Sequence, residues 1–91
     1  MNKDDLISKV ASSVGLSKTE AAKSVDAVFS TISGSLKNGN EVRLVGFGTF
    51  HVLSRAATMG RNPRTGESIQ IPAKKVPKFR AGKVLKHTVN N

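Results

Sequence analysis

The apolar residues of this chain change their spacing once, close to Asn40, and this change limits the fold more than any other feature of the sequence. Before this point they recur every three to four residues, which is the period of an amphipathic helix. After it they alternate with polar residues, as in a strand that buries one face. The sequence therefore predicts an α+β fold in which helices come first and antiparallel strands follow.

Two helices are predicted before the change in spacing. The first begins after Asn2, a favoured N-cap residue, and ends at Gly15. The second begins at Ser17, which forms a capping-box pattern with Glu20, and ends at Asn38-Gly39. Both helices carry apolar residues along one side, as amphipathic helices do.

Strands are predicted on both sides of a tight reversal at Val45–Gly48, one over residues 41–44 and the other over residues 49–55. The following residues, 56–73, are mostly small, basic or turn-forming, and the densest turn signal is Asn62–Gly66. We expect a long hairpin with its tip there and with no core of its own.

The chain is predicted to return from this hairpin through an edge strand or a bulge, because Pro72 and Pro77 cannot donate to a central ladder. A short basic helix then runs from Lys83 to about Val89, with Val84 and Leu85 as its inner residues. We treat residues 1–91 as a single domain, in which 1–54 and 75–91 form the body and 55–74 form the arm.

The body has a size at which single domains are marginal without disulfides, metals or oligomerisation, since only about seventy residues remain to build a core once the hairpin is set aside. The chain has no cysteine, so disulfides cannot stabilise it. For any single phenylalanine, burial within one subunit is the simpler reading. As a group, the large apolar residues of the body favour a homodimer with a core shared across a two-fold axis, formed by Phe29, Leu36, Leu44, Phe47, Phe50 and Phe79.

The charge of the chain is concentrated in its second half. Basic and acidic residues balance as far as Glu41, so the formal net charge of +9 lies entirely from Val42 onward, where Glu67 is the only acidic residue. Such an excess points to a polyanionic partner, and double-stranded DNA is the partner that we expect.

The predicted hairpin presents basic side chains in a form that fits a groove of duplex DNA. Two-residue alternation would place Arg55, Ala57, Met59 and Arg61 on one face. Further lysines and arginines at the body could hold flanking phosphates, although a solvated basic face is an equal alternative for each lysine. The candidate DNA-binding side chains are Lys3, Arg55, Arg61, Asn62, Pro63, Arg64, Lys74, Lys75, Arg80, Lys83 and Lys86.

Pro63 is a candidate for DNA intercalation, because a rigid apolar ring at an exposed tip can wedge between stacked bases from the minor groove. Taken alone, Asn62-Pro63 would merely start a turn. The arginines on both sides, Arg61 and Arg64, favour the wedge.

Other classes of function have less support. No nucleophile, base and orienting group stand together, so we expect no enzyme and no small-molecule substrate. His51 and His87 have no carboxylate cluster nearby, so neither a metal nor another cofactor is expected. RNA binding is disfavoured because the chain has no Trp or Tyr to stack bases. No apolar run could span a membrane or act as a signal peptide, so we expect a cytoplasmic protein.

Four stretches lie in order along nearly the whole chain, namely Met1-Asn2-Lys3, Val45–Phe50, Gly60–Pro63 with Thr65-Gly66, and Val76–Lys83. They give the chain a resemblance to the bacterial HU histone-like proteins of the HU and integration host factor group. It implies an intertwined homodimer with an N-terminal helix-turn-helix base, an antiparallel β-sheet saddle, a protruding β-hairpin arm per subunit and a short C-terminal helix.

The resemblance also implies a nucleoid-associated protein that wraps the minor groove, bends and compacts DNA with little sequence specificity, and prefers bent, nicked or flexible DNA. It implies that Pro63 is the intercalating tip and that the backbone near Gly46 and Gly48 approaches phosphate. The alternative is a sequence-specific DNA-bending factor resembling integration host factor. Relatives often carry a basic residue where this chain has Thr58, and Met59 is also neutral, so we expect weaker binding by the arm.

Overall fold

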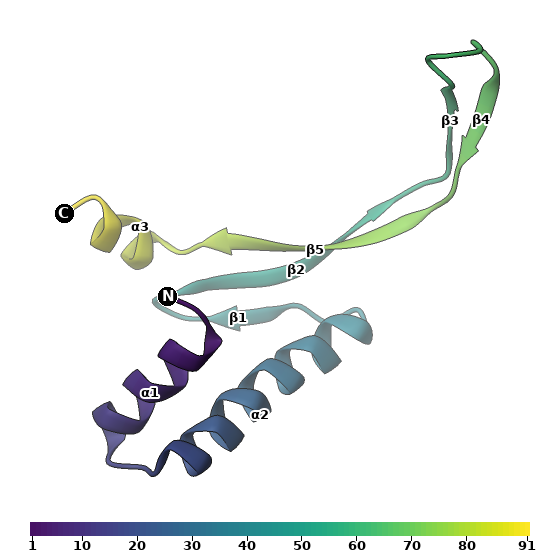
Figure 1. Cartoon of the computed structure of the whole chain (residues 1–91). Coiled ribbons are helices and arrows are strands. Elements are labelled where there is room, and N and C mark those ends of the chain that lie inside the picture. Colours follow the sequence, from purple (N-terminus) through teal and green to yellow (C-terminus); the bar gives the residue numbers. More distant parts are fainter. The chain divides into compact units, whose positions relative to one another are not determined.

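The computed structural model describes all residues, 1–91, and contains three helices and five strands. Two compact units, Met1–Gly34 and Ser35–Asn91, are described separately below. None of the helices combines the length and the apolar character needed to cross a membrane. The elements in chain order are α1 (Lys3–Val14), α2 (Lys18–Lys37), β1 (Val42–Leu44), β2 (Gly48–Arg55), β3 (Thr58–Arg61), β4 (Ser68–Ile71), β5 (Lys74–Ala81) and α3 (Lys83–Val89) (Figure 1).

The start and end of α1 are fixed by the residues that the sequence indicated. The backbone N–H of Asp5 donates to Oδ1 of Asn2 at 2.9 Å, and the backbone N–H of Asn2 donates to Oδ2 of Asp5 at 3.2 Å. This reciprocal capping box satisfies two backbone donors that a helix start would otherwise leave without partners. At the other end Gly15 adopts a left-handed conformation with φ of 70°, which a residue with a side chain rarely adopts.

A second capping box begins α2. The backbone N–H of Glu20 donates to Oγ of Ser17, and the backbone N–H of Ser17 donates to Oε1 of Glu20, both at 3.1 Å. Hydrogen bonds from Ser17 to the Glu20 carboxyl, first from its backbone N–H and then from its side chain, lower the pKa of that carboxyl below its usual value because they favour the charged form. The helix continues without a break through Gly34 to Lys37.

The core of the first unit is small. Its buried apolar side chains are those of Ile7, Ala21 and Val25. Five partly buried apolar residues pack against them, namely Leu6, Val10, Ala11, Leu16 and Ala22. Val28 and Phe29 belong to the apolar stripe that the sequence indicated on α2, yet both are exposed in the single chain. The stripe therefore extends beyond what one subunit covers.

The second unit is organised around a three-stranded antiparallel sheet in the order β1-β2-β5. The reversal between β1 and β2 is closed by a hydrogen bond from the Phe47 N–H to the Leu44 carbonyl at 3.0 Å, with Gly46 at φ 86°. Pro77 pairs with Val52 and lies on β5, the edge strand, as predicted for a residue that cannot donate to a ladder.

The arm is a separate two-stranded sheet made of β3 and β4 (Figure 1). Residues Ala56 and Ala57 lie in neither β2 nor β3, so the predicted single face from Arg55 to Arg61 is wrong. The alternation of side chains is interrupted where the chain passes from one sheet into the other. Within β3 itself, Met59 and Arg61 do lie two residues apart on one face.

The last helix, α3, follows Gly82, whose N–H donates to the carbonyl of Phe47 at 2.8 Å. The bounds of α3 agree with the prediction, but only one of the two residues predicted to face inward is covered. Leu85 is partly buried, whereas Val84 is 60% exposed. In a helix of only seven residues, apolar spacing does not determine which side is covered.

Candidate nucleic-acid interface

The tip of the arm is a closed turn between β3 and β4. The Asn62 N–H donates to the carbonyl of Glu67, and the Gly66 N–H donates to the carbonyl of Asn62, each at 2.8 Å. Oδ1 of Asn62 accepts from the backbone N–H of Arg64 at 2.9 Å. The predicted DNA-binding residue Asn62 therefore uses its side-chain oxygen to hold the turn.

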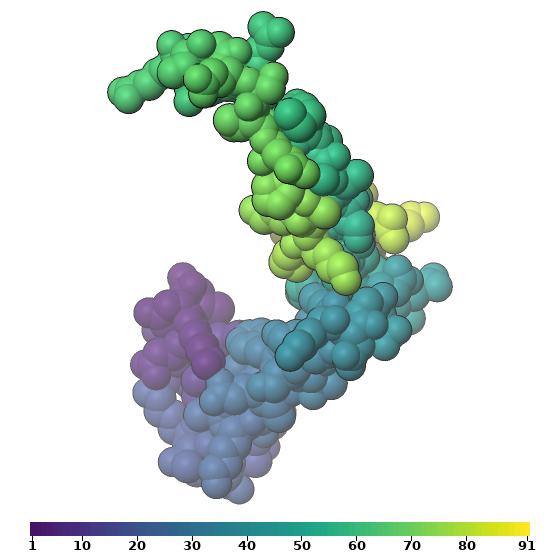
Figure 2. Space-filling model, turned by 90° about the vertical axis from the view of Figure 1, so that its right-hand side faces the viewer, coloured from purple at the N-terminus to yellow at the C-terminus, as the bar shows by residue number.

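This turn presents its neighbours to solvent. Pro63 and Arg64 lie inside it, and Arg61 lies at the end of β3; all three are exposed. In the space-filling view the arm, drawn in green, is a narrow projection with nothing packed against its tip (Figure 2). The geometry therefore leaves a rigid ring and two guanidinium groups free to meet a ligand.

No core stabilises the arm from within. Met59, Ile69 and Ile71 are all exposed, and only Gly60 and Asn62 are partly buried between Thr58 and Ile71. The prediction that the hairpin has no core is confirmed. Its exposed apolar side chains also provide a surface that could lie against the walls of a groove.

At the base of the arm two cations face each other. Arg55 and Lys74 form the last pair of the β2–β5 ladder, directly opposite each other. They also line a crevice of about 580 Å³, together with Ala56, Thr58, Ile71 and Pro72. Like charges directly across a strand pair repel, so an anion between them would stabilise this arrangement.

A further cluster forms where β2 begins. Thr49 pairs with Arg80, and the bond from Gly82 to Phe47 places the start of α3 beside the turn that contains Gly46. The fold therefore brings together Gly46, Arg80 and Lys83, which are far apart in the sequence. Gly46 is exposed, as are both cations.

Gly48 differs from Gly46 because it is buried. A β-carbon there would lie 2.7 Å from the carbonyl oxygen of Arg80 and 2.6 Å from ring carbon Cε1 of Phe79. The sequence indicates that the glycines flanking Phe47 allow close approaches that a side chain would forbid, and the register of β2 against β5 identifies Phe79 and Arg80 as the contacts at Gly48. Contact between this backbone and phosphate stays a prediction.

The remaining predicted cations lie at exposed positions. Lys75 pairs with Ser54 on the ladder, and Lys83 and Lys86 lie three residues apart on α3, close to one face of the helix. In the first unit, Nζ of Lys3 lies 2.6 Å from Oδ1 of Asp26. This predicted DNA ligand is therefore paired with a carboxylate in the free chain.

The ion pairs of the chain belong to the first unit. They are Lys3 with Asp26 and Lys18 with Asp4. No lysine or arginine from Val42 onward takes part in one, although that segment holds the whole +9 net charge. Its positive field is therefore not neutralised internally and is available to a polyanion.

Apolar surface is also exposed, at most of the positions predicted for a shared core. Phe29, Leu44, Phe47 and Phe79 are all exposed in the single chain, with Phe29 at 44%. Phe79 contacts both other rings of the sheet, with centroids 5.4 Å from Phe47 and 4.7 Å from Phe50. Leu36 and Phe50 are partly buried.

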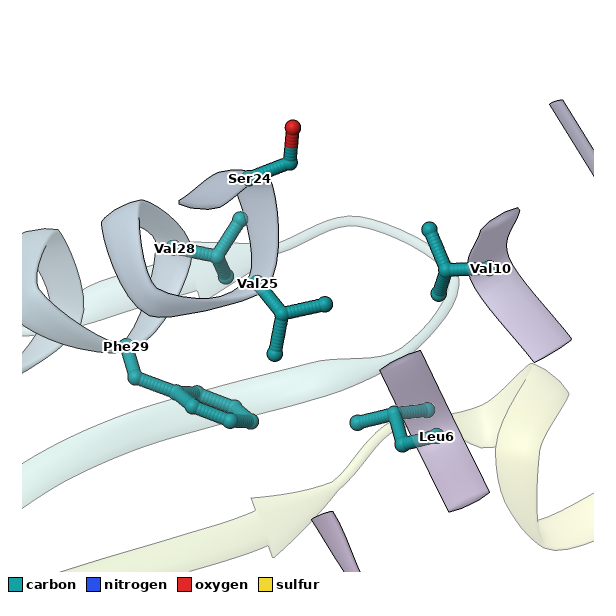
Figure 3. Close-up of a pocket in the computed structure, with 6 residues that line it drawn as sticks. All are labelled: Leu6, Val10, Ser24, Val25, Val28 and Phe29. Atoms are coloured by element: carbon teal, nitrogen blue, oxygen red, sulfur yellow. The ribbon is translucent and has the colours of Figure 1, made fainter. Parts of the chain in front are cut away.

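A groove of about 260 Å³ lies between the two helices of the first unit. Leu6 and Val10 of α1 face Val25, Val28 and Phe29 of α2 across it, and Ser24 lies at its rim (Figure 3). One subunit alone leaves this groove open, so it can take apolar side chains from another chain.

Comparison with known proteins gives matches over the full length. The family described as "Bacterial DNA-binding protein" matches residues 1–90. The chain is 59% identical over 90 residues to DNA-binding protein HRm of Rhizobium meliloti (strain 1021), covering 99% of this chain and all of that protein. It is 56% identical over 89 residues to DNA-binding protein HU of Geobacillus stearothermophilus, covering 98% and 99% of the two chains.

The fold is also similar to that of a solved complex. A cocrystal structure of Anabaena HU with DNA aligns with a TM-score of 0.87 and 42% sequence identity. The alignment covers 98% of this chain and 97% of that one. The likeness therefore includes the helices, the sheet and the arm.

Proposed function

The chain belongs to the family of bacterial DNA-binding proteins that includes HU, and we propose that it binds duplex DNA with little sequence specificity as a histone-like architectural protein. The observation that carries this proposal is the arm: Arg61, Pro63 and Arg64 are exposed on a hairpin without a core, and no acidic side chain neutralises them. Such a hairpin has no role in folding its own chain, and a role in gripping DNA explains it.

Binding begins with electrostatics. The unpaired cations of residues 42–91 replace counterions that are condensed on the DNA, and the release of those counterions drives association. Because no base edge needs to be read for this step, the affinity depends on salt more than on sequence. The predicted ligands Arg55 and Lys74 act at the base of the arm, and Arg80 and Lys83 act beside the turn at Gly46.

Bending depends on the tip of the arm. The turn held by Asn62 and Gly66 presents the ring of Pro63, which wedges between base pairs from the minor groove. Unstacking one step costs a few kcal/mol, and the contacts that a bent duplex makes with the protein offset this cost. DNA that is already bent, nicked or flexible requires less deformation and binds more tightly.

The binding species is a homodimer. A chain whose buried hydrophobic core consists of Ile7, Ala21 and Val25 lacks a sufficient core, and its exposed phenylalanines need a partner. A second copy supplies matching apolar side chains to the groove beside Phe29 and to the rings around Phe79. Two copies also provide two arms, one for each side of a bend.

The role is architectural and not catalytic, and its place is the bacterial nucleoid. The relatives named above are DNA-binding proteins. Neither they nor the fold favour a sequence-specific factor over a non-specific one.

A gel-shift experiment tests this function. Intact, nicked and pre-bent duplexes of equal length are titrated with the protein at two salt concentrations, with unrelated duplex as competitor. We expect tighter binding to the nicked and bent forms, equal competition by unrelated sequences, and a log–log salt slope of about −0.9 per phosphate contacted. A nearly flat salt dependence, or competition by one sequence only, would contradict the proposal.

A further inference from the structure

The arm has two chemically different faces. Directly paired residues of β3 and β4 share a face, and side chains alternate along each strand. One face carries Thr58, Gly60, Ile69 and Ile71. The other carries Met59, Arg61, Ser68 and Gln70, and we call it the polar arm face. Met59 is the one large apolar side chain among polar ones on that face.

The side chain of Met59 is open to solvent. Met59 is 68% exposed, against 46% for Ile69 and 47% for Ile71 on the opposite face. Its partner on the ladder, Gln70, is also exposed. The following residue, Gly60, has no side chain that could cover it. A small reagent dissolved in water can therefore reach the thioether.

Met59 also lies where the arm meets DNA in the function proposed above. It shares the polar arm face with Arg61, two residues further along β3, and Arg61 lies beside the turn that presents Pro63. A guanidinium that enters the minor groove from this face brings the neighbouring thioether to the same groove. In its reduced form methionine is a flexible apolar side chain that adapts to the wall it packs against.

Oxidation reverses the polarity of this contact. In the reaction with hydrogen peroxide, an S–O bond forms as the O–O bond breaks, the sulfur gives up two electrons, and water leaves. The product, a sulfoxide, is polar, and its oxygen accepts hydrogen bonds but donates none. The base edges of the minor groove present mainly acceptors, N3 of adenine and O2 of thymine. A sulfoxide oxygen facing them loses its hydration without gaining a donor.

We propose that Met59 is a peroxide-sensitive modification site, and that its conversion to the sulfoxide weakens the grip of the arm on the minor groove. The proposal rests on the DNA-binding function given above. The effect is reciprocal, since a duplex that covers the polar arm face also shields Met59 from peroxide. The second methionine of the chain, Met1, is 82% exposed and is oxidised as well, so the test must separate the two.

Binding by the oxidised chain provides the first test. The chain is treated with hydrogen peroxide, the excess is removed, and mass spectrometry of its peptides verifies that Met59 has gained one oxygen. Fluorescence anisotropy then measures the affinity for duplex DNA. The matched control is Met59→Leu treated in the same way, because it keeps Met1 and an apolar side chain at position 59 but has no sulfur there.

We expect the oxidised chain to lose affinity several-fold and oxidised Met59→Leu to lose none. Unchanged affinity of the oxidised chain, or an equal loss in Met59→Leu, would overturn the proposal. The log–log salt slope should stay the same, since a sulfoxide has no net charge and Arg61 and Arg64 keep their phosphate contacts. A slope that falls with the affinity would mean that the whole arm has left the DNA, and it would overturn the mechanism.

Protection from peroxide provides the second test. The rate at which Met59 gains oxygen is measured with and without saturating duplex, and a free methionine-containing peptide in the same solution serves as the reference. We expect DNA to slow oxidation of Met59 several-fold and to leave the reference peptide unaffected.

The two measurements separate this proposal from the function on which it rests. Equal rates of oxidation with and without DNA, while anisotropy still reports binding, would reject contact of Met59 with the duplex and keep the DNA-binding function. An absence of any anisotropy change for the unmodified chain would reject DNA binding itself.

Discussion

The ring of Phe79 lies directly against Gly48, so that a β-carbon at position 48 would come within 2.6 Å of ring carbon Cε1. The same β-carbon would lie 2.7 Å from the carbonyl oxygen of Arg80, which belongs to the backbone and cannot move aside freely. The contact explains why a residue without a side chain begins β2. It also ties the turn at Gly46 to β5 and so to the aromatic cluster.

We therefore expect Gly48→Ala to destabilise the fold by about 1–3 kcal/mol, the usual cost of overpacking. Urea denaturation followed by circular dichroism measures this change. The matched control is Gly34→Ala on α2, where a β-carbon would meet nothing within 4 Å. That control should raise the free energy of unfolding by about 0.5–1 kcal/mol, since alanine favours a helix interior. Equal effects of the two substitutions would contradict the packing explanation.

Asp26→Asn should increase the affinity for DNA, because it frees Lys3 from its ion pair. Both side chains are more than half exposed, so the pair contributes no more than about 1 kcal/mol. The gain in affinity is then at most about fivefold. Fluorescence anisotropy measures it, and Asp4→Asn is the control because it removes the same charge from the pair with Lys18. A gain of the same size in both variants would show that net charge alone is responsible.

Pro63→Ala should reduce DNA bending more than it reduces binding at low salt. The substitution removes the ring that wedges between bases but leaves Arg61 and Arg64 in place to attract phosphate. Energy transfer between dyes at the two ends of a duplex measures the bend, and anisotropy measures binding. Pro72→Ala, at the base of the arm, serves as the control. An unchanged bend angle would remove the wedge from the mechanism.

The capping box of α2 should make stability depend on pH in acid. The folded-state pKa of Glu20 is lower than the ordinary value of 4.5, so its stabilising contribution is complete above that value. It is lost as the pH falls through the lower folded-state pKa, where the carboxylate binds a proton. We expect Glu20→Gln to lower the melting temperature near neutral pH and to have little effect once the carboxyl is protonated. Melting curves of both proteins across this range, followed by circular dichroism, measure the difference.

Local signals in the sequence predicted the helices well. Asn2, Gly15, Ser17 and Glu20 each act through hydrogen bonds or backbone angles within a few residues of themselves. Such interactions do not depend on the rest of the fold, so pattern and chemistry suffice. The bounds of α3 and the position of Pro77 on an edge strand followed in the same way.

Features that depend on distant residues were not predicted. The interruption at Ala56 and Ala57 arises where one sheet gives way to another, and no turn signal marks it. The buried position of Gly48 requires β5 to lie alongside β2 in one register. The pairing of Lys3 with Asp26 joins two helices and depends on how they pack. In each case the residue types are visible in the sequence, but the position of the residue that each one contacts is not.

The arm contributes no side chain to any core. It therefore separates two properties that are coupled in most proteins, namely the affinity for the ligand and the stability of the fold. Residues from Thr58 to Ile71 can be exchanged with little effect on the melting temperature, because nothing in the body depends on them. The affinity for the ligand can therefore differ between lineages without a loss of folding stability.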